Sequence, residues 1–265
     1  MRAQARDTAR HERIIGVALD GEWGHDLCME TRVEEVAERI YQLSTYVPEA
    51  DFTFNQYLLD ADEPLLFHTG LRHLFPLVAD AVATVVPVER LRWVSFGHFE
   101  ADECGSMNEW LRAAPSATVA HSTIGVLVSV EDLADRPPHS LNDGDVLDLG
   151  TKQVRHVYTP HVPHAWDAGL LYEETTKTLL CGDLFGWASS FNAMTDGDLR
   201  ERAAAAEDLF HATALTPATA PTIRRLAELD IETLAPMHAP AFSGDCRAAL
   251  LGLADDYEAR MASAA

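Results

Sequence analysis

Four apolar segments of this chain are each followed directly by side chains that can bind metal ions. The clearest case is "SFGHFEADECGSMNEW" (95–110), in which His98, Glu100 and Asp102 occupy alternate positions after an apolar run. A solvated acidic turn would explain this segment alone, and so would a metal site. The rest of the sequence decides between them, because functional side chains of an α/β protein gather in the loops that follow its strands.

Three further segments repeat this placement. "YTPHVPHAWDAG" offers His161 and His164 after the expected strand "QVRHVY", "LLCGDLFG" places Asp183 after the run 178–181, and "LAPMHAPAF" places His238 after "IETLA". Each of these residues taken alone is more often an ordinary loop, turn or core residue. Their shared position at strand ends, next to Gly or Pro, predicts that three imidazoles and three carboxylates meet at one rim.

The N-terminal half alternates between expected helices and strands. Apolar spacing predicts an amphipathic helix over 31–47, two short strands around "DADEP" within 53–70, and a helix over 71–86 with Pro76 as an irregularity. "RLRWVSF" is typical of a buried strand that leads into the first candidate loop. Ser106-Met-Asn-Glu109 has the form of a capping box, which predicts that a helix begins at Ser106.

The C-terminal half is rich in short apolar segments and then returns to helical spacing. The expected strands are 117–122, 124–130, 145–150, 152–160, 169–174, 177–185 and 231–235, and the expected helices are 199–215, 220–230 and 246–263. This order predicts an α/β fold in which two sheets pack face to face between helical layers. Without internal repeats or a long linker, we expect one domain over 1–265, with halves of about 10–125 and 126–265.

Composition excludes several classes of function. The formal net charge is -22 and the pI is near 4.7, so nucleic acid and anionic membranes are unfavourable partners. No apolar run is long enough to cross a bilayer, and the start of the chain lacks the apolar stretch of a secretory signal. The four cysteines form no CxxC pair and are typical of reduced thiols in a cytoplasmic protein: Cys28, Cys104, Cys181 and Cys246.

The segment 158–185 resembles the metallo-β-lactamase fold, in which a metal-binding His precedes two strands and a Gly-Asp that carries the bridging carboxylate. That superfamily usually has a His-x-His-x-Asp-His motif, whereas this chain has His98-Phe99-Glu100-Ala101-Asp102-Glu103. Glu in place of the second His resembles the flavodiiron proteins and, more closely, their stand-alone relatives, the oxygen-binding diiron proteins. "NQYLLDADEPLLFHTG" and "APMHAP" extend the similarity from about 55 to 242. The resemblance implies an αβ/βα four-layer sandwich with two mixed sheets.

The same resemblance implies a set of metal ligands. The first metal would take His98, Glu100, His164 and Asp183, and the second Asp102, Asp183 and His238, with Asp183 as the bridge. His164 is preferred to His161 because its distance from "CGD" matches the family, which leaves His161 as a residue behind the ligands or in the pocket. Glu103 stands where many relatives have another His. Two roles are open for it: an extra ligand of the second metal, or a side chain that points away.

Ligand chemistry favours iron over zinc, with zinc or manganese as alternatives, because hydrolytic zinc sites use more imidazole. The resemblance implies a non-haem diiron protein that binds O2 and reduces O2 or NO. We expect no FMN domain within this chain, so electrons would come from a separate partner. Two alternatives are a dinuclear zinc hydrolase and an O2 or redox sensor without catalysis. Flavodiiron relatives also suggest a homodimer.

Residues around the expected site receive lesser roles. An apolar wall over the metals is expected from aromatic side chains that would otherwise be assigned to the core: Phe99, Trp166, Phe185, Trp187 and Phe191. Cys104 is interpreted as a packed thiol rather than a redox-sensitive one. Six other histidines receive no role: His68, His73, His121, His139, His156 and His211.

Overall fold

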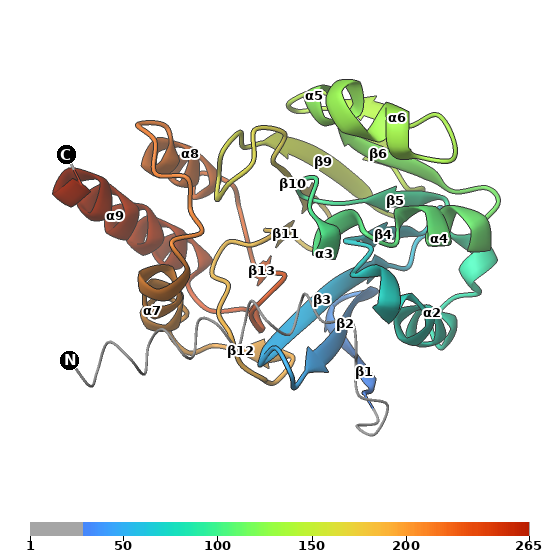
Figure 1. Ribbon diagram of the computed structural model, residues 1–265, viewed down its shortest axis with the longest axis horizontal. Helices are drawn as coiled ribbons and strands as arrows, with labels where there is room; N and C mark the ends of the chain where they lie inside the picture. The colour runs from blue at the N-terminus through green and yellow to red at the C-terminus, as the bar shows by residue number, and fades with distance from the viewer. Residues whose placement is uncertain (1–28, 265) are drawn as a thin grey trace.

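The computed structural model describes residues 29–264 of the chain. Within them, two sheets of seven strands pack face to face and helices cover the outer faces (Figure 1). The first sheet has the order β1-β2-β3-β4-β5-β6-β7, and the second has the order β12-β14-β13-β11-β10-β9-β8. The predicted α/β four-layer sandwich is therefore confirmed.

The two halves of the chain build the two sheets in turn. The strands of the first sheet are β1 Thr31–Ala37, β2 Ile40–Val47, β3 Phe52–Leu59, β4 Leu65–Phe67, β5 Trp93–Ser95, β6 Thr118–Ser122 and β7 His139–Leu141. Those of the second are β8 Val146–Asp148, β9 Gln153–Tyr158, β10 Gly169–Glu173, β11 Thr178–Leu180, β12 Met194–Thr195, β13 Thr233–Ala235 and β14 Ala241–Phe242.

Helices follow the same division. Those beside the first sheet are α2 Phe75–Ala83, α3 Ala101–Cys104, α4 Met107–Ala113, α5 Thr123–Gly125 and α6 Glu131–Leu133. Those beside the second are α7 Arg200–Phe210, α8 Thr219–Leu226 and α9 Cys246–Ala264 (Figure 1). No helix among residues 29–264 combines the length and the apolar character needed to cross a bilayer.

Three layers of apolar side chains hold this sandwich together. The middle layer lies between the sheets and takes residues such as Tyr57 and Phe67 from the first sheet and Leu171 and Leu180 from the second. The two outer layers pack each sheet against its helices, with Trp110 buried in one and Tyr257 in the other. Burial of these apolar surfaces is the main force that fixes the strands and therefore the loops at their ends.

Strand direction brings the candidate loops to one edge. In the second sheet β11 pairs parallel with β13, and β9 runs in the same direction as β11 because each is antiparallel to β10. The segments after β9, β11 and β13 carry His164, Asp183 and His238. In the first sheet, the loop after β5 carries His98 and its neighbours. The predicted strands within 53–70 are confirmed as β3 and β4.

The predicted helix over 31–47 is wrong, because these residues form the antiparallel hairpin of β1 and β2. The turn places Arg39 at a φ of 55°, and the Glu35 carboxylate accepts the Arg39 N–H. The apolar positions at helical spacing include Val33, Val36 and Ile40, which are β-branched, and such residues favour strands when a neighbouring strand is available. Pairing of β2 with β3 supplies that neighbour.

The predicted strand over 124–130 is also wrong. This segment is helical, and the Ser122 hydroxyl caps it by accepting the Gly125 N–H at 3.2 Å. Leu127 is 71% exposed, whereas an inner strand would have buried it. A short apolar run does not distinguish a strand from a helix by itself.

Two local expectations about helix starts are adjusted. Pro76 does not interrupt its helix but lies in the first turn of α2, where its missing N–H costs nothing. Ser106 does precede α4, yet its side chain makes no capping bond and instead donates to the carbonyls of Gly70 and Leu71. Ser106 therefore links the candidate loop to the segment that follows β4.

Candidate metal centre

Six candidate side chains meet where the two sheets share an edge. Four of them, His98, Glu100, His164 and Asp183, place one ligand atom each within 4.8 Å of one another. Nε2 of His164 lies 3.1 Å from Oε2 of Glu100 and 3.3 Å from Oδ2 of Asp183. Nε2 of His98 lies 2.8 Å from Oε2 of Glu100 and 3.7 Å from Oδ2 of Asp183. One cation could contact all four residues.

The other oxygen of Asp183 faces a second group. Oδ1 of Asp183 lies 3.4 Å from Nε2 of His238, which in turn lies 3.2 Å from Oδ2 of Asp102. Nδ1 of His238 is 2.9 Å from the carbonyl oxygen of Thr53, so its Nδ1–H donates there and Nε2 is left to face the site. Asp183 thus stands between two clusters, with one carboxylate oxygen toward each.

Glu103 lies behind His98 and does not join the second cluster. Its Oε1 is 3.4 Å from Nδ1 of His98, and its Oε2 accepts the backbone N–H of Gly97 at 2.5 Å. Nε2 of His68 lies 3.4 Å from the same Oε2, and both residues are fully buried. The contacts of the Glu103 carboxylate are thus with His98, His68 and the Gly97 N–H, and none of them is with Asp102 or His238.

A second buried pair, Asp167 and His121, contacts the same loop. Oδ2 of Asp167 accepts the Phe99 N–H at 3.0 Å and lies 3.0 Å from Nε2 of His121. Nδ1 of His121 faces the Phe96 carbonyl at 3.2 Å. Two carboxylate and imidazole pairs thus bracket the loop that carries His98. Sequence reasoning gave His68 and His121 no role and did not single out Asp167, although each lies within or just after a strand-end segment.

Electrostatics in the cluster favour charged imidazoles in the absence of metal. Burial alone would lower the pKa of His98, but Glu103 and Glu100 raise it to about 12. Burial would likewise lower the pKa of His238, but Asp102 and Asp183 raise it to about 9. Hydrogen bonds from His164 and His98 hold the pKa of Glu100 well below its usual range. Cations must displace these protons when they bind, because imidazole coordinates metal in its neutral form.

The pKa values of the two carboxylates Asp183 and Glu103 shift in opposite directions, although burial acts on both in the same way. Burial raises the pKa of Asp183. The nearby histidines His238 and His98 act to lower it, and the negative charges of Glu103 and Asp102 act to raise it further. Burial would also raise the pKa of Glu103, but His68 and His98 hold it at about 2. Asp183 is therefore the carboxylate whose ionised form gains most from a nearby cation.

A cavity of about 370 Å³ opens onto both clusters. Its walls include Glu100, Asp102, His164, Asp183 and His238 on the polar side. The lining also includes aromatic side chains, among them one each from helices α7 and α9: Phe52, Phe185, Trp187, Phe210 and Tyr257. A small apolar molecule in this cavity would touch the side chains of both clusters.

Several expected residues lie elsewhere. Of the expected aromatic wall, Phe185 and Trp187 line this cavity, whereas Phe99 lines a separate hollow and Phe191 a third. Trp166 is 54% exposed and His161 is exposed, and neither lines the cavity. The sequence predicted more aromatic residues in this wall than the structure places there. A residue that is close in sequence to a metal ligand need not point its side chain toward the same cavity.

The cysteines show ordinary packing where they are described. Cys104 is buried, and burial together with Glu103 raises the pKa of its thiol to about 12, which disfavours the reactive thiolate. Cys181 and Cys246 are also buried free thiols. Cys28 lies outside the described residues.

The family model described as "ODP family beta lactamase" matches residues 52–239. Among curated proteins, the chain is 27% identical over 150 residues to diflavin flavoprotein A 1 of Synechocystis sp., a match that covers 56% of this chain and 26% of that protein. The chain therefore spans about a quarter of the length of such relatives.

Solved structures show the same fold. The rubredoxin oxygen:oxidoreductase of Desulfovibrio gigas matches with a TM-score of 0.73 and 17% identity, over 87% of this chain and 62% of that one. A metal-soaked flavodiiron core from Synechocystis sp. matches with a TM-score of 0.72 and 21% identity, over 89% of this chain and 62% of that one.

Proposed function

The chain belongs to the family described as ODP family beta lactamase, and from this premise we propose that it is a non-haem diiron oxidoreductase that binds O2 and reduces O2 or NO. The observation that carries the proposal is the position of Asp183, with Oδ2 toward His98 and His164 and Oδ1 toward His238. A carboxylate in this position can bridge two cations. The names of relatives, such as rubredoxin-oxygen oxidoreductase of Megalodesulfovibrio gigas, support this class of reaction.

We assign two metal half-sites on either side of this carboxylate. The first half-site consists of His98, Glu100, His164 and Oδ2 of Asp183. The second half-site consists of Asp102, His238 and Oδ1 of Asp183. The assignment is supported by the shared cluster of the first four residues and by the distances of 3.2 and 3.4 Å that join the second three.

The residues present fit a pair of iron ions. Oδ1 of Asp183 and Oδ1 of Asp102 are buried without a hydrogen-bond partner in the described structure, although buried carboxylate oxygens are normally paired. Cations would satisfy both atoms. The set of three carboxylates and three imidazoles suits iron or manganese better than zinc, whose hydrolytic sites use more imidazole.

Bound iron would supply one-electron redox chemistry and open positions for a diatomic gas. The chain itself orients the ligands and shapes the cavity above them. Phe52 packs on the His238 ring with centroids 4.6 Å apart, which holds this imidazole in place. The apolar side of the cavity limits water at the site and accepts a neutral gas more readily than an ion.

Electrons reach the site from a separate donor in this proposal. The expectation that residues 1–265 form one domain without FMN stays a prediction, as do the homodimer and the cytoplasmic location. Relatives carry flavin in their names, as in the diflavin flavoproteins. We therefore propose a redox protein as the partner. The comparisons give no support to the zinc hydrolase alternative.

Anaerobic loading with ferrous iron followed by exposure to O2 tests this function. We expect about two iron ions per chain, near-ultraviolet ferric bands after O2 is admitted, and continued O2 or NO consumption once a reductase and its reductant are added. A matched Asp183→Asn protein should show much weaker bands and no continued consumption. Oxidation without continued consumption would favour the sensor alternative, and a colourless protein that binds only zinc would contradict the diiron proposal.

A further inference from the structure

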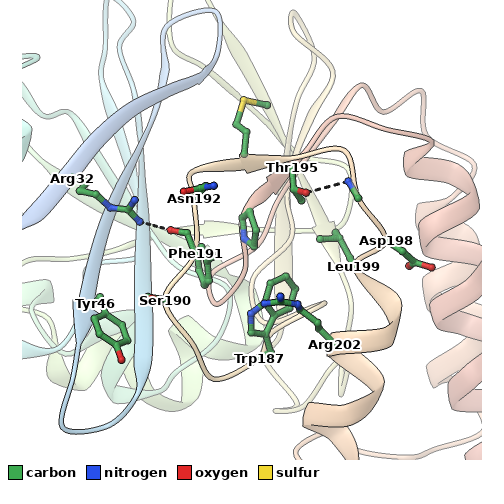
Figure 2. Close-up of a pocket in the computed structure, with 13 residues that line it drawn as sticks. Arg32, Tyr46, Trp187, Ser190, Phe191, Asn192, Thr195, Asp198, Leu199 and Arg202 are labelled. Atoms are coloured by element: carbon green, nitrogen blue, oxygen red, sulfur yellow. Dashed lines mark hydrogen bonds between the residues drawn. The ribbon is translucent and has the colours of Figure 1, made fainter.

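A larger cavity of about 750 Å³ lies beside the metal cavity, and Trp187 lines both. Figure 2 shows that Arg32 of β1 and Arg202 of α7 reach it from different sides, with Phe191 between them and the Arg202 side chain over Trp187. We propose that this cavity binds a small organic anion that has an aromatic body and a carboxylate or phosphate group. We call it the arginine cavity.

The positive charges of the two arginines are available to an anionic ligand. Neither Arg32 nor Arg202 has a carboxylate partner within 4.0 Å in residues 29–264, in a chain with 42 acidic and 20 basic residues. Nη2 of Arg32 donates to the Phe191 carbonyl at 2.6 Å, which fixes the guanidinium and leaves its other N–H groups for a ligand (Figure 2). Arginine presents several N–H donors in a plane that matches carboxylate and phosphate oxygens.

The acidic residue of this cavity is already paired. Asp198 lines the arginine cavity, but its carboxylate accepts from Nε and Nη2 of Arg200 at 3.1 and 2.9 Å. Asn192 adds a side-chain amide to the lining. The local balance of charge in the arginine cavity is therefore positive, opposite to that of the whole chain.

The rest of the lining suits an aromatic body. The rings of Trp187 and Phe191 lie 5.8 Å apart at an angle of 66°, and the guanidinium of Arg202 lies 5.5 Å from the Trp187 ring centroid. Leu199 and Pro240 add apolar surface. A simple inorganic ion would leave this surface unused. Cavities of several hundred Å³ with an apolar lining and a few polar groups are typical of sites for small organic molecules.

Binding of phenyl phosphate, measured by calorimetry on metal-free and iron-loaded protein, tests the proposal. We expect saturable binding that is equal within about twofold in the two forms, and about tenfold weaker binding of inorganic phosphate and of phenol. Arg202→Gln and Arg32→Gln should each weaken phenyl phosphate binding about tenfold. The matched control Arg247→Gln removes the same charge from an exposed site on α9 and should change it less than about twofold.

Several results would overturn the proposal. Absence of saturable binding in both forms would do so, as would equal weakening in Arg247→Gln, because either would remove the role of the two arginines. Binding only to iron-loaded protein would assign the anion to the metals. Inorganic phosphate that binds as tightly as phenyl phosphate would remove the aromatic part of the ligand. Circular dichroism of each variant confirms that it is folded, and the two arginine variants provide independent measurements.

Discussion

The two proposed half-sites differ in the number of their ligands and in how exposed those ligands are. The first half-site has three side chains beside Asp183, and two of them lie toward solvent, with the Glu100 side chain 53% and the His164 side chain 25% exposed. The second half-site has two, and they are more buried, with His238 8% and Asp102 18% exposed. The larger ligand set is thus the more accessible one.

In the second half-site, His238 is held in place by its neighbours. His238 donates to the Thr53 carbonyl and packs against the rings of Phe52 and Phe54, with centroids 4.6 and 5.4 Å away. We infer that the first half-site binds its ion more tightly because it has one more ligand, and that the second keeps more open positions for a gas. Substitutions can separate the tightness of metal binding from the number of open positions. They are made at the shared Asp183, at a ligand of one half-site, and at a residue that supports a ligand.

Asp183→Asn should have the largest effect, because it removes the charge that both half-sites share. We expect the iron content to fall from about two to less than one ion per chain after anaerobic loading and desalting. Elemental analysis measures this directly. Asp196→Asn is a matched control, since Asp196 is exposed and its replacement removes the same charge. Retention of both ions in Asp183→Asn would contradict the bridging assignment.

His238→Ala should remove one ion and leave the other. The second half-site would then hold only Asp102 and a shared oxygen, whereas the first half-site would be unchanged, so we expect about one iron per chain. Elemental analysis and the intensity of the ferric bands both report this value. His139→Ala, at an exposed position, is the control. If His238→Ala instead removed both ions, the half-sites would not be separable and the comparison between them would fail.

The pH dependence of metal binding should differ between the half-sites. The pKa of His238 is raised to about 9, so each unit of pH increase below 9 should strengthen binding at the second half-site about tenfold, as one proton leaves. The pKa values of both His98 and His164 are raised, so the first half-site should gain up to about a hundredfold per unit.

Chelator competition between about pH 6 and pH 8 measures these slopes. The His238→Ala protein reports the first half-site alone, and a pH-stat counts the protons released in each case. A slope near zero would mean that the imidazoles are already neutral before metal arrives. If the wild-type protein and His238→Ala showed the same change of metal affinity per pH unit, the two half-sites would not differ in proton release.

Sequence patterns predicted which candidate side chains lie close together better than they predicted the helices and strands around them. His98, His164, Asp183 and His238 each follow an apolar run that forms a strand, and a buried strand leaves a short and recognisable signal. The prediction of a helix over 31–47 was wrong because β1 and β2 are stabilised by strand pairing, including the pairing of β2 with β3. The periodicity of a short segment carries no information about such pairing. The strand expected over 124–130 failed because apolar composition does not report exposure.

The residues behind the ligands were harder to predict. His68 follows β4 as His98 follows β5, so the same rule of strand ends could have found it. His121 lies within β6. Asp167 lies in the loop after β9, and nothing in the sequence tells which backbone N–H will donate a hydrogen bond to its carboxylate. Glu103 could not be assigned from sequence, because a carboxylate next to Asp102 can turn toward a metal or away from it. Only the three-dimensional contacts distinguish these cases.

Glu103→Gln should have the smallest effect of these changes and should act on one half-site. The amide keeps an oxygen for the Gly97 N–H but loses the charge that faces Nδ1 of His98. We expect iron binding at the first half-site to weaken about tenfold, with the second half-site unchanged within about twofold, measured by chelator competition. Glu131→Gln, an exposed carboxylate, is the control. Weakening confined to the second half-site would instead make Glu103 a ligand of the second metal, and the ligand sets on the two sides of Asp183 would then be equal in number.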